Sequence, residues 1–131
     1  VITGLGALAP NGNSVVNFWS GLLAGKSGIQ RVSYFDAEDF SVKIAGELSD
    51  FNADDYFDRK ELRKLDPFSI YGLVTAAEAI AHSGLDVNTI DRDRAGVIIG
   101  SGVGGIQTLE DQHMVMQNKG PGGFPLSSYP R

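Results

Sequence analysis

The stretch that decides the fold class is AGVIIGSGVGG, at residues 95–105. Its first part, residues 95–100, is continuously apolar, which is typical of a parallel strand covered on both faces. The glycines that follow turn the chain, and the composition of residues 106–117 favours a helix. The stretch therefore predicts a central strand, a tight turn and a helix, which together form one unit of an α/β fold.

Two further strands are predicted nearer the start of the chain. Residues 1–3 are apolar and β-branched and stop at a glycine, so we expect a short buried strand. Residues 42–48 alternate between apolar and polar side chains, as a half-buried strand does. Residues 29–40 show no clear period and predict irregular structure, and residues 51–58 predict a loop with a short helical turn.

The helices are marked by their ends as well as by their periodicity. Apolar residues recur at spacings of three and four over residues 14–24, where Asn13 or Ser14 supplies an N-cap and Gly25 a stop. A short helix is predicted at residues 59–65.

The longest predicted helix follows Asp66-Pro67, which resembles an N-cap with proline at the first helical position. Residues 68–81 are apolar nearly all round, so we expect a helix buried on most sides, ended by Gly84. Alternating strands and helices again predict an α/β fold.

Composition limits the function classes. The chain has 131 residues, of which 42% are hydrophobic and 21% charged, as in one globular domain. It contains no cysteine, which excludes disulfides, thiolate metal sites and a cysteine nucleophile within these residues and fits a cytoplasmic location. The net charge of −5 argues against a nucleic-acid partner, and no apolar run is long enough to predict a membrane span. The lack of an initiator methionine predicts a chain that has lost its start.

The glycines at residues 100–105 satisfy the dinucleotide-binding pattern G-x-G-x-x-G. That pattern normally opens the first βαβ unit and is followed about 20 residues later by an acidic residue. Here the chain becomes rich in glycine and proline by that point, from about residue 119 to 131. The alternative is that these glycines let the backbone approach a neighbouring element or an apolar ligand closely.

Three basic residues, Lys60, Arg63 and Lys64, are spaced so that a helix would place them on one face. Clustered cations can attract an acidic partner through charge-assisted hydrogen bonds. The alternative is ordinary pairing with Asp58, Glu61 or the acidic stretch before them. Spacing alone leaves both interpretations open.

Taken together, four motifs resemble the β-ketoacyl-[acyl carrier protein] synthases, most closely the synthase II branch. They are residues 1–6, Trp19 with residues 22–29, residues 59–66 and residues 99–105, and the likeness runs collinearly to about Pro121. The resemblance implies a thiolase-like layered fold, a mixed sheet packed by helices, of which this chain would be an incomplete amino-terminal portion.

The resemblance also implies an activity. Such enzymes extend an acyl chain by decarboxylative Claisen condensation with malonyl-carrier protein in fatty acid biosynthesis. They use a nucleophilic cysteine and two histidines and need no cofactor or metal. We expect all three catalytic residues to lie beyond residue 131, so that this segment is inactive alone and has no catalytic residue. The implied partners are the acyl carrier protein, acyl and malonyl thioesters and, in the complete protein, a second copy in a homodimer.

Site residues follow from the same resemblance. Lys60, Arg63 and Lys64 match basic positions that such synthases use to dock the acidic carrier protein. Val103 matches a position that lines the acyl channel, where family members often carry the bulkier isoleucine. After Pro121 the likeness weakens, because Gly122-Gly123 stand where relatives often carry basic residues.

Three alternatives remain open at this point. A polyketide ketosynthase, or its catalytically inactive chain-length partner, shares most of these motifs. A binding module without chemistry would use only the three basic residues. A nucleotide-binding oxidoreductase would rest on two glycine motifs alone, at residues 100–105 and, as a weaker match, at residues 4–9.

Overall fold

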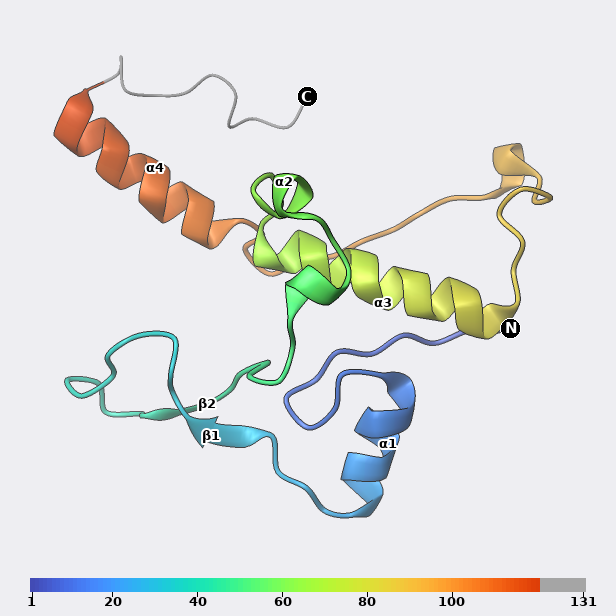
Figure 1. The fold of residues 1–131 in the computed structure, drawn as a ribbon, viewed down its shortest axis with the longest axis horizontal. Helices are drawn as coiled ribbons and strands as arrows, with labels where there is room; N and C mark the ends of the chain where they lie inside the picture. The colour runs from blue at the N-terminus through green and yellow to red at the C-terminus, as the bar shows by residue number, and fades with distance from the viewer. Residues whose placement is uncertain (121–131) are drawn as a thin grey trace. The chain divides into compact units, whose positions relative to one another are not determined.

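A computed structural model describes residues 1–120 (Figure 1). The chain divides into two units, one formed by residues 1–52 with 73–95 and the other by residues 53–72 with the chain from residue 96 onward. The elements in chain order are α1 (Val15–Leu23), β1 (Ile29–Arg31), β2 (Ile44–Gly46), the 3-10 helix η1 (Ala53–Asp55), α2 (Arg59–Leu62), α3 (Pro67–Ser83), the 3-10 helix η2 (Arg92–Arg94) and α4 (Ile106–Lys119).

The strands β1 and β2 form an antiparallel pair in which Gln30 lies opposite Ala45. The strand predicted at residues 42–48 is confirmed in its central part, as β2. The prediction of irregular structure over residues 29–40 was wrong at its start, where β1 forms. A three-residue strand shows no period in sequence, because its pairing depends on a partner elsewhere in the chain.

Helix α1 confirms the prediction for residues 14–24. Ser14 is the N-cap, and its hydroxyl accepts a hydrogen bond from the Asn17 amide at 3.2 Å. The helix stops before Gly25, whose φ of 65° places it in the left-handed region. Its apolar face is not buried in this structure, since Trp19 and Leu23 are 59% and 73% exposed.

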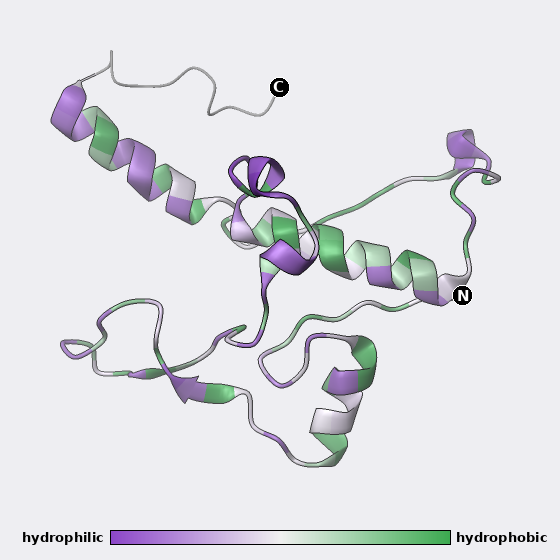
Figure 2. Ribbon diagram, viewed as in Figure 1, coloured by the Kyte–Doolittle hydropathy of each residue, from purple (hydrophilic) through white to green (hydrophobic). Residues whose placement is uncertain are grey.

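Helix α3 starts at Pro67 and ends before Gly84, as predicted. The expectation that it would be buried on most sides was wrong. Ile70 and Val74, one turn apart, are buried, whereas Leu73 is 48% exposed. In Figure 2 most of α3 is coloured as hydrophobic, yet among its residues only Ile70 and Val74 are buried, and the others are half-buried or exposed.

The segment before α1 lies directly against α3, because its glycines have no side chains. A Cβ atom on Gly4 would lie 2.1 Å from the Ala79 carbonyl oxygen, and one on Gly6 would lie 1.9 Å from the Thr75 carbonyl oxygen. Both distances are far below a van der Waals contact. Only glycine allows this backbone-to-backbone approach.

Polar contacts hold the same segment on α3. The carboxylate of Glu78 accepts hydrogen bonds from the Ala7 amide and from the Val15 amide, each at 2.8 Å. His82 accepts one from the Leu5 amide through Nδ1 at 3.1 Å. Because Val15 is the first residue of α1, Glu78 joins the start of that helix to α3 as well as to the glycine segment.

Two of the three predicted strands do not form. Residues 1–3 and 95–100 are irregular, and Ile2 and Ile98 are 81% and 99% exposed. A strand requires a hydrogen-bonded neighbour, and neither segment has one among residues 1–120. The sheet seen in this part of the chain is the two-stranded antiparallel pair, in place of the predicted mixed sheet.

In the second unit, α4 confirms the helix predicted for residues 106–117 and extends it to Lys119. Thr108 in this helix donates a hydrogen bond to Asp66 Oδ1 at 2.6 Å. Asp66 was predicted to be the N-cap of α3. Its backbone carbonyl accepts a hydrogen bond from the Ser69 amide in the first turn of that helix. Its carboxylate, however, accepts a hydrogen bond from Thr108 in α4. The predicted Gly/Pro-rich tail lies mostly at residues 121–131, outside the described residues.

Candidate functional site

The short helix α2 is held by a capping box at its start. The Asp58 carboxylate accepts hydrogen bonds from the Lys60 amide at 2.7 Å and the Glu61 amide at 2.9 Å. In return, the Glu61 carboxylate accepts from the Asp58 amide at 3.2 Å. Both acidic side chains thus satisfy backbone donors that a helix start leaves free.

The three basic residues lie on and just after α2, and all are exposed. Lys60 is inside the helix, and Arg63 follows it in a helical backbone conformation, with φ of −66° and ψ of −12°. The Lys64 amide donates to the Glu61 carbonyl at 2.9 Å, in a turn after the helix end. The structure therefore brings the three together on one short segment, although the single continuous helix predicted for residues 59–65 ends at Leu62. Figure 2 shows α2 as one of the most hydrophilic parts of the chain.

The alternative that these cations pair with nearby acids is not what residues 1–120 show. Asp58 and Glu61 bond the backbone, and no ion pair joins Lys60, Arg63 or Lys64 to an acidic side chain in the described part of the chain.

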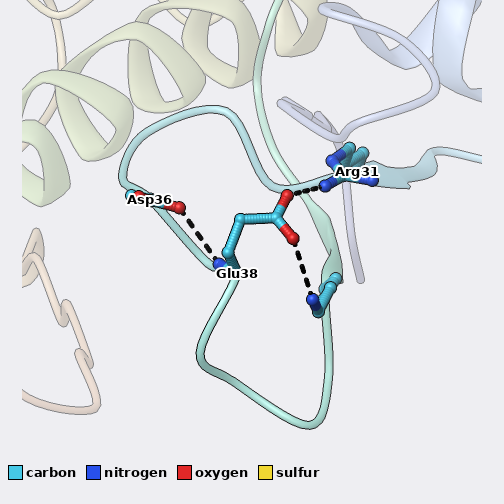
Figure 3. Close-up of polar contacts among 4 residues, drawn as sticks. Arg31, Asp36 and Glu38 are labelled. Carbon is cyan, nitrogen blue, oxygen red and sulfur yellow. Dashed lines mark hydrogen bonds and ion pairs between the residues drawn. The ribbon is translucent and has the colours of Figure 1, made fainter.

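One residue of the acidic stretch before α2, Glu38, forms ion pairs with basic residues. Figure 3 shows Glu38 bound to Arg31 through one carboxylate oxygen. Its other oxygen accepts a hydrogen bond from Lys43 Nζ at 3.0 Å. The Glu38 amide donates to Asp36 Oδ1 at 3.0 Å. Glu38 therefore pairs with one cation on either side of the β1–β2 connection.

The glycine loop before α4 serves close packing. The Gly104 amide donates to Ser101 Oγ at 3.0 Å, and a Cβ atom on Gly105 would lie 2.4 Å from Asp66 Oδ2. No strand precedes this loop in the structure, so the context that a dinucleotide fingerprint requires is not met. Val103 lies in the loop and is 73% exposed. The structure places it on a different segment from the three basic residues.

Neither histidine occupies a catalytic arrangement in residues 1–120. His82 bonds the Leu5 amide, and His113 Nε2 lies 3.0 Å from Gln117 Nε2 on the same helix. Within this range no group of three or more histidine, aspartate and glutamate side chains could hold a metal ion. The described helices are also too short or too polar to cross a bilayer.

The structure reveals one nearly buried carboxylate that the sequence did not single out. Glu47 is 5% exposed and accepts hydrogen bonds from the Ser33 hydroxyl at 2.6 Å, the Ser33 amide at 3.0 Å and the Tyr34 amide at 3.3 Å. The Ser33 hydroxyl is the main reason that the pKa of Glu47 lies below its usual range. In sequence, Glu47 looked like a solvent-facing position of an alternating strand. The sequence feature that could have indicated its burial is Ser33, whose hydroxyl lies across the hairpin and donates to this carboxylate.

Comparison with known proteins identifies the class. The chain belongs to the β-ketoacyl synthase family, since the family model described as "Beta-ketoacyl synthase, N-terminal domain" matches residues 1–129. The 3-oxoacyl-[acyl-carrier-protein] synthase 2 of Staphylococcus aureus is 47% identical over 121 residues, which cover 92% of this chain and 30% of the relative. The protein of the same name from Synechocystis sp. is 40% identical over 121 residues, 92% of this chain and 29% of the relative.

Solved structures agree with this family. A type II polyketide synthase acyl-carrier protein in complex with its ketosynthase bound to the hexaketide matches with a TM-score of 0.75 and 31% identity, over 95% of this chain and 32% of that one. The ishigamide ketosynthase/chain length factor matches with a TM-score of 0.73 and 24% identity, over 96% and 32% respectively, and shows the shared fold. The chain thus spans about a third of the length of the proteins that it matches.

Proposed function

We propose that this chain is the amino-terminal portion, residues 1–131, of a 3-oxoacyl-[acyl-carrier-protein] synthase of the synthase 2 type. The observation that carries the proposal is the 47% identity to the Staphylococcus aureus enzyme of that name over 92% of the chain. The whole protein would extend acyl chains by decarboxylative condensation with malonyl-carrier protein, as an acyltransferase of fatty acid biosynthesis. We expect it in the cytoplasm as a homodimer, with the thiolase-like layers completed outside these residues.

In this reaction the segment would not carry out the bond-forming chemistry itself. A cysteine thiolate would take the acyl group, and two histidines would help decarboxylation of the malonyl thioester to a carbanion that attacks it. The 131 residues contain no cysteine, and the described histidine His82 bonds the backbone. We expect the catalytic residues in the rest of the protein. The segment contributes a carrier-docking surface and part of the acyl channel.

The docking surface would be Lys60, Arg63 and Lys64. Its support is that all three are exposed, that they are close in the chain, and that the adjacent acids are engaged in the capping box. An acidic carrier protein would find three cations that make no ion pair within residues 1–120. The ketosynthase captured with its acyl-carrier protein, 31% identical to this chain, gives independent support for a carrier partner.

Charge reversal in the full-length protein tests this surface. Replacing Lys60, Arg63 and Lys64 by glutamate removes up to three pairs, each contributing about 0.2–1 kcal/mol, and adds repulsion. We therefore expect the KM for carrier-bound substrate to rise about 10- to 100-fold with little change in kcat. Lys119→Glu, an exposed change on α4, is the matched control.

A second substrate separates docking from chemistry. A short thioester without a carrier protein should react equally well with the triple variant and the parent. Equal loss of activity with both substrates would refute docking at α2, but it would leave the proposed condensing function of the unaltered protein in place. Absence of malonyl-carrier-dependent elongation by the unaltered protein would refute the proposed function itself.

A polyketide ketosynthase is the second candidate. It is favoured by the 31% identical ketosynthase that is bound to a hexaketide. Product analysis distinguishes the two, because a polyketide enzyme releases chains that retain their β-keto groups when no reducing enzymes are supplied, and needs several condensations on the unreduced chain. The higher identity to the synthase 2 relatives supports the fatty-acid assignment.

A further inference from the structure

Helix α2 is a single turn of four residues (Figure 1). Forming the first turn of a helix fixes several backbone angles in return for one hydrogen bond, so isolated helices shorter than about 12 residues are marginal in water. Packing gives α2 little support, since Arg59, Lys60 and Glu61 are exposed and Leu62 is half-buried. The hydrogen bonds at its start therefore contribute a large share of its stability.

Asp58 accepts the hydrogen bonds at the start of α2. Its backbone is extended, with φ of −76° and ψ of 162°, as is usual at an N-cap. One carboxylate oxygen, Oδ1, accepts from the Lys60 amide at 2.7 Å and from the Glu61 amide at 2.9 Å. These are two of the amides that a helix start leaves without a partner. A single side chain therefore holds the backbone of the first turn.

The same bonds reach the backbone of all three proposed docking residues. The Lys60 amide donates to Asp58 directly. The Glu61 amide also donates to Asp58. The Glu61 carbonyl in turn accepts from the Arg63 amide and from the Lys64 amide, the second at 2.9 Å. Loss of the cap would thus release the backbone from which each docking side chain extends.

Charge alone predicts the opposite role for Asp58. A carboxylate beside Lys60, Arg63 and Lys64 repels an acidic partner and should weaken docking. Asp58 is exposed, however, and a single exposed charge contributes weakly and is screened within about 8 Å at physiological salt. Replacement of an N-cap residue by alanine changes the opening equilibrium of a helix about 2- to 30-fold. The effect of the cap therefore outweighs that of the charge.

We propose that Asp58 is a positioning residue for carrier docking, an acid that strengthens the binding of an acidic partner. It orders the segment that carries Lys60, Arg63 and Lys64 through backbone hydrogen bonds, and it does not need to contact the partner itself. This inference rests on the proposed docking at these three residues. It adds that their backbone must be ordered as well as their side chains charged.

The test compares three neutral replacements in the full-length protein, Asp58→Asn, Asp58→Ser and Asp58→Ala. All three remove the same charge, but only asparagine and serine keep an oxygen that can cap the helix. Serine and alanine differ by a single hydroxyl. Any difference between these two variants therefore reports the cap and not the charge.

The main measurement is the KM for carrier-bound substrate. We expect Asp58→Asn and Asp58→Ser to stay within about twofold of the parent. The KM of Asp58→Ala should be about three- to tenfold above that of Asp58→Ser, because only molecules in which α2 is formed bind the carrier well. The kcat should be the same in all variants, and a short thioester without a carrier should react equally well with each. Hydrogen exchange at the Lys60 and Glu61 amides should be faster in the alanine variant than in the serine variant.

Asp91 offers the matched control, since it caps another short helix in the other unit. Its side chain accepts from the Asp93 amide at 3.1 Å at the start of η2. Asp91→Ala should leave the KM for carrier-bound substrate unchanged. A comparable rise in this control would show a general loss of stability and would overturn the inference.

The inference is also overturned if Asp58→Ser and Asp58→Ala have equal KM values, or if the alanine variant loses as much activity with the carrier-free thioester. Either result would leave elongation by the unaltered protein, and hence the proposed function, in place. Absence of elongation by the unaltered protein would refute the proposed function and this inference with it.

Discussion

Glu78 offers the sharpest test of how the first unit is held together. Its two carboxylate oxygens accept hydrogen bonds from the amides of Ala7 and Val15, both at 2.8 Å and both partly buried. Glu78→Gln keeps one carbonyl oxygen and places an amide nitrogen, which cannot accept, where the second oxygen was. One backbone donor therefore loses its partner. Glu78→Ala removes the acceptor for both.

The magnitude follows from the two bonds. A hydrogen bond to a charged group contributes about 1.5–3 kcal/mol, and each 1.36 kcal/mol is a factor of ten. Loss of one bond should therefore speed local opening, and hydrogen exchange at that amide, by about 10- to 150-fold. In Glu78→Gln we expect this at one of the two amides, with a smaller change at the other. In Glu78→Ala both should exchange faster.

The assay is amide hydrogen exchange followed at Ala7 and Val15, which reports local opening and does not require global unfolding. Glu110→Gln, an exposed change on α4, is the matched control and should alter neither amide. If both amides of Glu78→Ala exchanged within about threefold of the parent rate, Glu78 would not be the link between the glycine segment, α1 and α3.

The remaining predictions concern pH, packing and channel width. The pKa of Glu47 is lowered in the folded protein, so the stabilisation that its carboxylate provides is fully present above the usual glutamate pKa of about 4.3. This stabilisation is lost as the pH falls through the folded pKa. Glu47→Gln should therefore lower the thermal midpoint at pH 7, and its difference from the parent should shrink below about pH 4. Gly6→Ala should lower the free energy of unfolding, measured in urea, by about 1–3 kcal/mol, because its Cβ would clash with a carbonyl oxygen. Gly72→Ala on α3, where a Cβ meets open space, should raise it by about 0.5–1 kcal/mol. Equal effects of the two changes would refute the close approach of the glycine segment to α3. Val103→Ile in the full-length protein should shorten the longest acyl product, and an unchanged product distribution would exclude Val103 from the channel lining.

Helix ends were predictable because their signals are local. Ser14 and Gly25 delimit α1, and Pro67 and Gly84 delimit α3, each acting on backbone groups within one turn. The helix interiors were less predictable. The apolar composition of α3 indicated burial on most sides, but burial depends on which other segments reach it.

Strands were predicted less well because pairing is not a local property. The apolar run at residues 95–100 carries a stronger strand signal than Ile29–Arg31, yet only the second has a partner in residues 1–120. Glu78 illustrates the same limit for polar contacts, since the amides that it bonds lie 71 and 63 residues away in the chain. No spacing rule connects positions so far apart.

For the candidate docking site, the sequence identified the basic residues, and the structure showed that they are exposed and make no ion pair within residues 1–120. The spacing of Lys60, Arg63 and Lys64 identified a basic cluster but left pairing with Asp58 or Glu61 open. Within residues 1–120, Asp58 and Glu61 form the capping box and no ion pair joins an acid to the cluster, so the pairing interpretation is not supported there. The assignment of the cluster to carrier docking, and of Val103 to the acyl channel, stays a prediction until the variants are measured.

The distribution of charge around α2 also has a kinetic consequence. The chain carries a net charge of −5, so an acidic protein approaching from most directions is repelled. Basic residues outnumber acidic ones at residues 58–64, four to two, so this short segment at α2 is a local exception whose attraction extends about 8 Å at physiological salt. Under the proposed docking, encounters that present other faces would be short-lived, while those that present α2 would persist. The uneven distribution of charge along one short segment would then select the orientation in which an acidic partner arrives.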